Sequence, residues 1–282
     1  MAESADARRA QWILIEPPRG FAPVRLGELW AYRELLGFIA WRDVAVRYKQ
    51  SALGILWALL TPLVTVAIFT LIFGRVAQIP SDGVPYAVFC YAGLLPWLFF
   101  SQSVQRATVS MVAERNLLTK VYFPRLIVPI SATLAPLVDF AIASSILAAL
   151  MVWYRVVPSA HALYLVPLCI AWAWLVAVGV GALLAAANVY YRDVGQVIPF
   201  LLQVWMYASP VVYPTSLLPS GLRWLHALNP LVGIIDTLRF ALFTRGPAPG
   251  AALFVSLSVS AALVAIGLAC FARMERSFAD VV

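Results

Sequence analysis

The stretch "WRDVAVRYKQSALGILW", residues 41–57, changes character halfway along its length. Its first nine residues include three cations and one acid, whereas its last six carry no charge. The apolar half belongs to an uncharged run over residues 55–73, close to the ~20 residues that a helix needs to cross the hydrocarbon core of a bilayer. The stretch therefore predicts a charged helix at a membrane surface that leads directly into a transmembrane helix.

The chain as a whole is strongly apolar. Its 282 residues are 63% hydrophobic and 12% charged, with a mean hydropathy of +0.88. An ordinary soluble domain is roughly 45–50% apolar and about 25% charged, and a soluble fold this apolar could not cover its surface with polar groups. We therefore predict an all-α polytopic membrane protein. The net charge of +7 then reports topology and not nucleic-acid binding.

Long apolar runs predict six transmembrane helices. They cover residues 55–73, 84–105, 126–154, 162–191, 194–222 and 246–272, the last of which is better begun at Ala251. Asp139, in the third run, is the one charged residue inside them. A charge at the centre of a spanning helix costs roughly 2.5–3.5 kcal/mol, and such residues are functional by default. We therefore expect Asp139 to face protein or water, or to be protonated.

Residues 213–246 interrupt the pattern of long apolar runs. Prolines, which end helices, recur in this segment, and Asp236 and Arg239 are among its charged residues. We predict two short re-entrant helices over residues 214–245, because irregular backbone is tolerated at membrane depth where protein or water covers it. A seventh crossing over residues 224–243 is the alternative, and it would carry both charges through lipid.

The distribution of Lys and Arg predicts the orientation of the spans. With the N-terminus inside, fifteen of the 20 Lys and Arg fall on the cytoplasmic side and five fall outside. Residues 1–32 and 273–282 are then cytoplasmic tails, and residues 51–272 form the six-span domain. Both termini are therefore expected in the cytoplasm.

Three charged segments of the cytoplasmic face are candidates for docking another protein. Residues 33–50 predict an amphipathic interface helix, and residues 111–124 predict a helical elbow, with a helix over residues 111–122 that ends before Pro124. In the interface helix we expect Leu35, Leu36, Phe38, Ile39 and Val46 on one face and Arg42, Asp43, Lys49 and Gln50 on the other. The docking candidates, which include the short connection before the fifth span, are Arg42, Asp43, Arg47, Glu114, Arg115, Asn116, Lys120, Arg192 and Asp193. A basic membrane anchor and a solvated loop are the alternatives.

Six motifs occur along the chain in this order: "LGELWAYRELLGFIAWRDVAVRYKQSALGILWALLTPL", "YAGLLPWLFFSQSV", "LLTKVYFPRLIVP", "NVYYRDVG", "SPVVYP" and "LNPL". Each motif alone is weak, whereas the combination is specific. Together they resemble a known family, the membrane subunit of the type-2 ABC exporters that move polysaccharides. The resemblance is to the O-antigen and capsule exporter permeases, with the teichoic acid permease as a relative, and it covers about residues 20–272.

The resemblance implies a homodimer with six spans per subunit, paired with two copies of a cytoplasmic ABC ATPase. It implies that the interface helix and the elbow dock onto the ATPases, and that the re-entrant helices gate the outer side. The cargo would be a polyprenyl-diphosphate-linked glycan, exported across a bacterial inner membrane. The sequence contains no G-x-x-x-x-G-K-[ST] phosphate loop. ATP and Mg would therefore belong to the partner, and this non-enzymatic subunit would need no cofactor and no metal of its own.

The resemblance also suggests where the cargo makes contact. In the family, spans one and five line the path, and sugar faces stack on aromatic rings; the alternative is that these rings mark the membrane interface. The aromatic candidates on the two spans are Trp57, Phe69, Phe73, Phe200, Trp205, Tyr207 and Tyr213. Arg42, Arg47 and Lys49 lie at the depth of the lipid diphosphate, although attraction to anionic lipids, about 1 kcal/mol per cation, explains them equally well.

Three other kinds of membrane protein compete with this interpretation. A type-2 ABC permease for drugs or haem would share the architecture. A proton-coupled secondary transporter would usually show inverted repeats and several intramembrane ionisable groups, and the sequence shows no clear repeat and only Asp139. A glycosyltransferase acting on polyprenyl lipids would need clustered acids at the membrane face, whereas the cytoplasmic acids here are scattered among bases.

Overall fold

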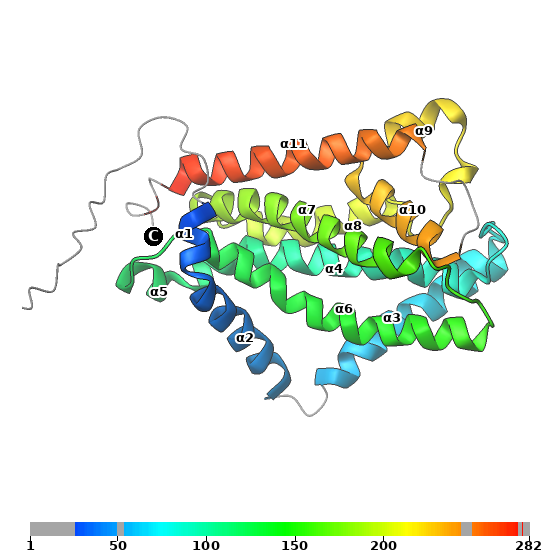
Figure 1. Ribbon diagram of the computed structural model, residues 1–282, viewed down its shortest axis with the longest axis horizontal. Helices are drawn as coiled ribbons and strands as arrows, with labels where there is room; N and C mark the ends of the chain where they lie inside the picture. The colour runs from blue at the N-terminus through cyan, green and yellow to red at the C-terminus, as the bar shows by residue number, and fades with distance from the viewer. Residues whose placement is uncertain (1–25, 50–53, 244–249, 276–277, 279–282) are drawn as a thin grey trace, which may run out of the picture.

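The computed structural model describes residues 26–49, 54–243, 250–275 and 278. Within these ranges every regular element is helical and strands are absent. The helices α4, α6, α7 and α11 run along the long axis of the molecule, and α2 and α3 form a V beside them (Figure 1). The prediction of an all-α polytopic membrane protein is confirmed.

Five helices of the described chain are long and apolar enough to cross a membrane. They are Leu56–Val76, α4 (Tyr86–Ala113), α6 (Ile127–Trp153), α7 (Ala162–Tyr190) and α11 (Ala251–Met274). The first joins α3 (Gly54–Phe69) to a π-helical segment, η1 (Thr70–Val76). A bond of 2.8 Å from the amide of Ala77 to the carbonyl of Ile72 continues the i→i+5 pattern of this segment.

Helix α4 is the centre of the fold. It packs against α6 on one side and α7 on the other (Figure 1), and its residues are buried around almost the whole circumference, as expected for a helix that is apolar all round. Helix α11 packs on α7 where two glycines meet: a Cβ on Gly179 would lie 2.6 Å from the backbone of Val264, and Gly267 lies against Gly179 itself. Small residues at such a contact let two membrane helices approach closely.

The predicted fifth span, residues 194–222, is wrong as a continuous helix. Helix α8 (Val194–Tyr207) has 14 residues and is therefore about 21 Å long, which is shorter than the ~30 Å hydrocarbon core. A run of turns follows it, and the chain then forms the short helix η2 (Thr215–Leu217). The physical reason is Pro210 and Pro214, each of which lacks the amide that a helix would need.

Two further boundaries differ from the sequence prediction near the end of α4. Helix α4 runs to Ala113 and not to residue 105, so that Arg106 lies inside the spanning helix. The elbow, expected as one helix over residues 111–122, is interrupted at Glu114, and only α5 (Arg115–Lys120) remains. Burial of Ala107 and Met111 against the neighbouring helices continues α4 past the point where charge first appears in the sequence.

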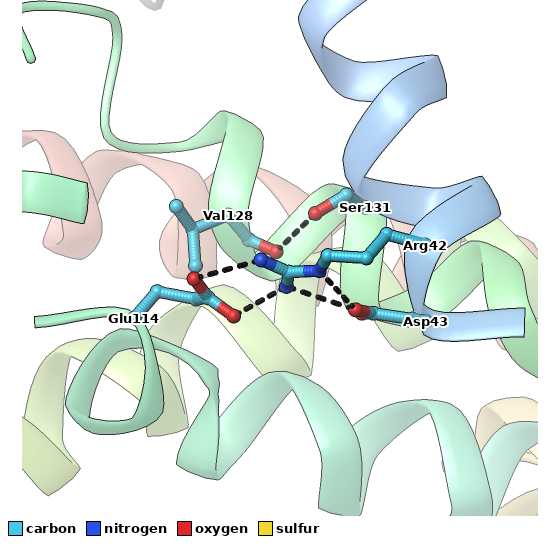
Figure 2. A network of polar contacts seen from close by, with 5 residues as sticks. All are labelled: Arg42, Asp43, Glu114, Val128 and Ser131. Atoms are coloured by element: carbon cyan, nitrogen blue, oxygen red, sulfur yellow. Dashed lines mark hydrogen bonds and ion pairs between the residues drawn. The ribbon is translucent and has the colours of Figure 1, made fainter. Parts of the chain in front are cut away.

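The predicted division of the interface helix into two faces is wrong. Helix α2 (Arg33–Lys49), which follows the short helix α1 (Leu26–Ala31), buries Ile39 but leaves Phe38 and Val46 exposed. Arg42 instead turns toward the helices of the bundle (Figure 2). The reason is that acids on α4 and α6 attract the cations of α2 inward. Gln50 lies outside the described residues.

Two short helices follow η2, α9 (Ser220–His226) and α10 (Pro230–Phe243). Helix α10 packs on α4 and α7 (Figure 1), so that its charges lie within protein. Asp236 accepts a hydrogen bond from the hydroxyl of Thr215, and Arg239 is 5% exposed. The alternative of a crossing that carries both charges through lipid does not describe this packing.

Arg239 holds the irregular backbone after α8 in place. Its guanidinium donates to the carbonyls of Pro210 at 2.6 Å, Val211 at 2.8 Å and Phe89 at 3.2 Å, and it lies 3.6 Å from the centroid of the Phe89 ring. Gly93 leaves room for it, since a Cβ there would lie 2.5 Å from an Arg239 nitrogen. One side chain thus supplies donors to a stretch of chain that cannot form a helix.

Replacing Arg239 by Met keeps a long side chain but leaves the carbonyls of Pro210 and Val211 without donors. Each buried acceptor left unsatisfied costs about 1–3 kcal/mol. We therefore expect the thermal unfolding midpoint of the purified protein in detergent to fall by roughly 5–10 °C. Arg223→Met is the matched control, because this exposed guanidinium also donates to two backbone carbonyls. Equal shifts in the two variants would contradict the assignment.

Candidate functional site

The interface helix is joined to the C-terminal end of α4 by an ion pair. Arg42 Nη1 lies 3.2 Å from Glu114 Oε2, Arg42 Nη2 bonds the other carboxylate oxygen, and the same guanidinium reaches Asp43 at 2.9 Å (Figure 2). The hydrogen bond that Arg42 donates to the Glu114 carboxylate raises the pKa of Arg42. Glu114 is also the residue at which α4 ends and α5 begins. The elbow therefore meets the interface helix at one bidentate contact.

A second ion pair lies deeper and joins the interface helix to α6. Arg47 pairs with Asp139, and the hydroxyl of Tyr48 donates to the other oxygen of the same carboxylate. Burial, followed by the hydrogen bond to Asp139, raises the pKa of the Tyr48 hydroxyl to about 12, so that it remains a donor. The lone acid of the third span therefore faces protein, where an intramembrane charge is expected to find a partner.

A cavity of about 390 Å³ lies beside this second ion pair, between α3, α4 and α6. Arg47 and Asp139 form part of its lining, together with Gln102. The remaining wall is mostly apolar and includes Trp57 and Phe99. A mostly apolar cavity with a few polar groups is typical of a small-molecule site.

The other predicted docking residues lie at the same end of the molecule as the Arg42–Glu114 pair. Arg115, Asn116 and Lys120 are exposed on α5, and Arg192 and Asp193 are exposed in the turn between α7 and α8. The amide of Gly195 donates to the Asn188 side chain at 2.8 Å and fixes that turn. The structure therefore divides the predicted set: Arg42, Asp43, Arg47 and Glu114 contact one another or α6, and the other five face outward.

The seven predicted path aromatics also divide into two groups. Phe69 and Phe73 stack edge to face on each other, with ring centroids 5.6 Å apart. Trp205 donates to Asn229 and Tyr213 bonds His226, so that both are held within the subunit. The exposed members are Trp57, Phe200 and Tyr207.

Two of the three candidate lipid-diphosphate contacts are occupied by ion pairs within the protein. Arg42 and Arg47 are both engaged by carboxylates, and Lys49 is exposed. Sequence reasoning missed Tyr48, Gln102 and Arg106, which surround the same ion pair and cavity. The available signal was that an acid at membrane depth needs a partner, but the sequence did not say which cation supplies it.

The described chain is thus a bundle of helices long enough to cross a membrane, with a charged, ion-paired helix across one end. The chain belongs to the ABC-2 type transporter family, whose match covers residues 34–243.

Similar proteins within this family are named for polysaccharide export. The chain is 32% identical over 256 residues to the O-antigen export system permease protein RfbA of Myxococcus xanthus, covering 90% of this chain and 97% of the relative. It is 28% identical over 250 residues to the RfbA permease of Klebsiella pneumoniae, covering 88% and 95%. It is 26% identical over 242 residues to the polysialic acid transport protein KpsM of Escherichia coli, covering 84% and 92%.

A double-mutant cycle tests the contact between the interface helix and the elbow. Arg42→Gln and Glu114→Gln should each destabilise the purified protein, and their effects should be non-additive by about 0.5–1 kcal/mol, since the pair is partly exposed. The measurement is the free energy of unfolding in detergent. Arg115→Gln is the matched control, because no hydrogen bond or ion pair joins its side chain to another described residue. Additive effects of Arg42→Gln and Glu114→Gln would rule out the contact.

Proposed function

We propose that this protein is the transmembrane subunit of an ATP-driven exporter that moves a polyprenyl-diphosphate-linked polysaccharide from the cytoplasm across the inner membrane. The observation that carries the proposal is the match, over nearly the whole chain, to permeases named for O-antigen export and polysialic acid transport. The apolar helices and the charged end described above fit a translocation subunit that does not hydrolyse ATP itself.

The partner is a cytoplasmic ABC ATPase, present in two copies and carrying ATP and Mg. The exposed residues of α5 and of the turn after α7 offer it charged contacts at one end of the bundle. Because Arg42 ties the interface helix to Glu114 beside α5, a push on the elbow reaches α2 and, through Arg47 and Asp139, α6. The distribution of Lys and Arg supports cytoplasmic termini, although residues 1–25 and 279–282 lie outside the described residues.

A second copy of the chain completes the path for the glycan. Helix α3 and helix α11 are the spanning helices with the least burial in the subunit, and such open apolar faces are suited to a homodimer contact or to lipid. Trp57, Phe200 and Tyr207 remain exposed on spans one and five. Their rings offer flat faces on which sugars can stack without being held by charge.

Export of a drug or of haem by the same architecture is the competing function. The names of the relatives favour polysaccharide. Proton-coupled transport draws no support from Asp139, because that acid is held by Arg47 and Tyr48.

Co-purification with its ATPase tests the proposal directly. We expect polyprenyl-linked glycan to stimulate ATP hydrolysis by the reconstituted complex several-fold, and drugs or haem to leave it unchanged. Charge reversal at Arg115 should abolish this stimulation while the permease stays in the membrane, because Arg115 lies at the proposed contact with the ATPase. Charge reversal at Glu114 should also abolish it, because that change breaks the link from the elbow to Arg42 on the interface helix. Stimulation by haem or a drug alone would contradict the proposed cargo.

Removing exposed aromatic faces tests the path. Phe200→Ala and Tyr207→Ala together should reduce export of the polymer several-fold, because each ring is more than half exposed on α8. Export is measured as the surface glycan of complemented cells at equal permease abundance. Tyr164→Ala on α7 is the control, since Tyr164 is 58% exposed but belongs to neither path span. Unchanged export in the double variant would show that these rings of α8 do not contact the polymer.

A further inference from the structure

Phe278 anchors the chain beyond the C-terminal end of α11, which lies at the same end of the molecule as α5 (Figure 1). Its side chain is 1% exposed, although it follows the last spanning helix. Its ring meets that of Phe271 edge to face, with centroids 5.7 Å apart, and lies 6.0 Å from the ring of Tyr190 at the end of α7. The chain after α11 is therefore fixed to the bundle at this residue.

Arg125, in the connection between α5 and α6, contacts the same place. Its guanidinium donates to the backbone carbonyl of Glu275 at 2.9 Å, and its backbone amide donates to the Glu275 carboxylate at 3.2 Å. The guanidinium also lies over the Phe278 ring, with Cζ 5.9 Å from the centroid, an arrangement that attracts a cation to an aromatic face. The last carbonyls of a helix lack intrahelical donors, so Arg125 satisfies a group at the end of α11.

Helix α7 and an apolar cluster complete this junction. The hydroxyl of Tyr190 donates to the carbonyl of Met274 at 3.2 Å. Phe278 belongs to an apolar cluster that also contains Ile39 of α2 and Leu126 at the start of α6. We call Arg125, Tyr190, Glu275 and Phe278 the C-terminal latch, because they close the end of α11 onto the connection after α5 and onto α7.

Helix α11 has few other attachments to the subunit. The share of buried residues in its most apolar stretch is 17%, against 83% for α4. Along its length it packs mainly on α7 and α10, and its contact with α7 includes Gly179 and Gly267, which offer no side chains to interlock. A movement of the elbow therefore reaches α11 most directly through Arg125.

We propose that the C-terminal latch carries movement of the elbow to α11, in addition to the route through Arg42 to α2. The inference rests on the proposed function, because the movement comes from the partner ATPase. Pro124 restricts the backbone between α5 and Arg125, so that a displacement of α5 is passed on and not absorbed. Arg125 and Phe278 are positioning residues in this proposal: they act through α11 and do not touch the cargo.

Two variants break the latch in different ways. Arg125→Gln removes the donor to the Glu275 carbonyl and the cation over the Phe278 ring without opening a cavity, and Phe278→Ala removes the ring. Each should lower the surface glycan of complemented cells several-fold, at equal permease abundance, while the complex with the ATPase still assembles and hydrolyses ATP. If Phe278→Ala fails to fold in detergent, Arg125→Gln alone decides.

The chain offers a matched control for each variant. Arg33 donates to the carbonyl of Trp30 at 3.2 Å and lies 5.4 Å from the Trp30 ring, so it makes the same two kinds of contact away from the latch. Arg33→Gln should therefore export as the wild type does. Phe254→Ala removes a ring that is 70% exposed near the other end of α11, and it should also leave export unchanged.

The direct measurement is hydrogen exchange of the full chain, co-purified with its ATPase in detergent, with and without ATP trapped by vanadate. The two segments compared are residues 121–126 and residues 268–275. In the wild type both should change protection when ATP is trapped, because the latch joins them. In Arg125→Gln and Phe278→Ala only the first should change. A joint change in both variants, or a wild type in which only residues 121–126 respond, would overturn the latch.

Failure of the latch and failure of the proposed function give different results. If the two segments respond to ATP together only when the latch is intact, but glycan-lipid leaves ATP hydrolysis unstimulated, the latch stands and the proposed cargo falls. If glycan-lipid stimulates hydrolysis, but residues 268–275 of Arg125→Gln respond to ATP as in the wild type, the exporter stands and the latch falls.

Discussion

Every charge and every unpaired backbone group inside a membrane must find its partner within the protein, because hydrocarbon offers none. The structure depends on this constraint at two places. Arg239 satisfies carbonyls of the turn after α8, where the chain cannot be helical. Asp139 is satisfied by two side chains of α2. The first contact allows a spanning segment to end short, and the second fixes a surface helix to the bundle.

The two contacts lie at different levels of the transport subunit, since Arg239 meets α4 at Phe89 and Asp139 shares a cavity with Gln102, further along the same helix. The Arg239 contact holds the segment between α8 and α10, far along the chain from the interface helix. The Asp139 and Glu114 contacts hold the interface helix near the elbow. In the proposed exporter, force from an ATPase would pass to the spans through the second kind of contact, which would have to be reversible. Ion pairs that are partly exposed meet that need better than buried apolar packing does.

Apolar runs were sufficient to predict the class of fold and most of the helices. The predicted third span, residues 126–154, and α6 (Ile127–Trp153) differ by one residue at each end, because a long uncharged run allows few other choices. The predicted fifth span was too long, because it was defined by the absence of charge. That criterion ignores the backbone amides that Pro210 and Pro214 lack. The faces of α2 were misassigned, because helical periodicity separates apolar from polar residues within one helix. It carries no information about acids on other helices, which draw the cations of α2 inward. For the same reason the sequence could not predict that Asp139 pairs with Arg47.

The π-helical segment at the C-terminal end of the first span has a geometrical consequence. A straight α-helix turns by about 100° per residue, whereas a π-helical turn accommodates one more residue before the chain comes round again. The face that α3 presents near Trp57 is therefore not continued by the same residue spacing beyond Thr70. Span one therefore consists of two segments, α3 and η1, whose side-chain faces are rotated relative to each other about the helix axis. A ligand moving along the span would contact one face on α3 and a different one on η1.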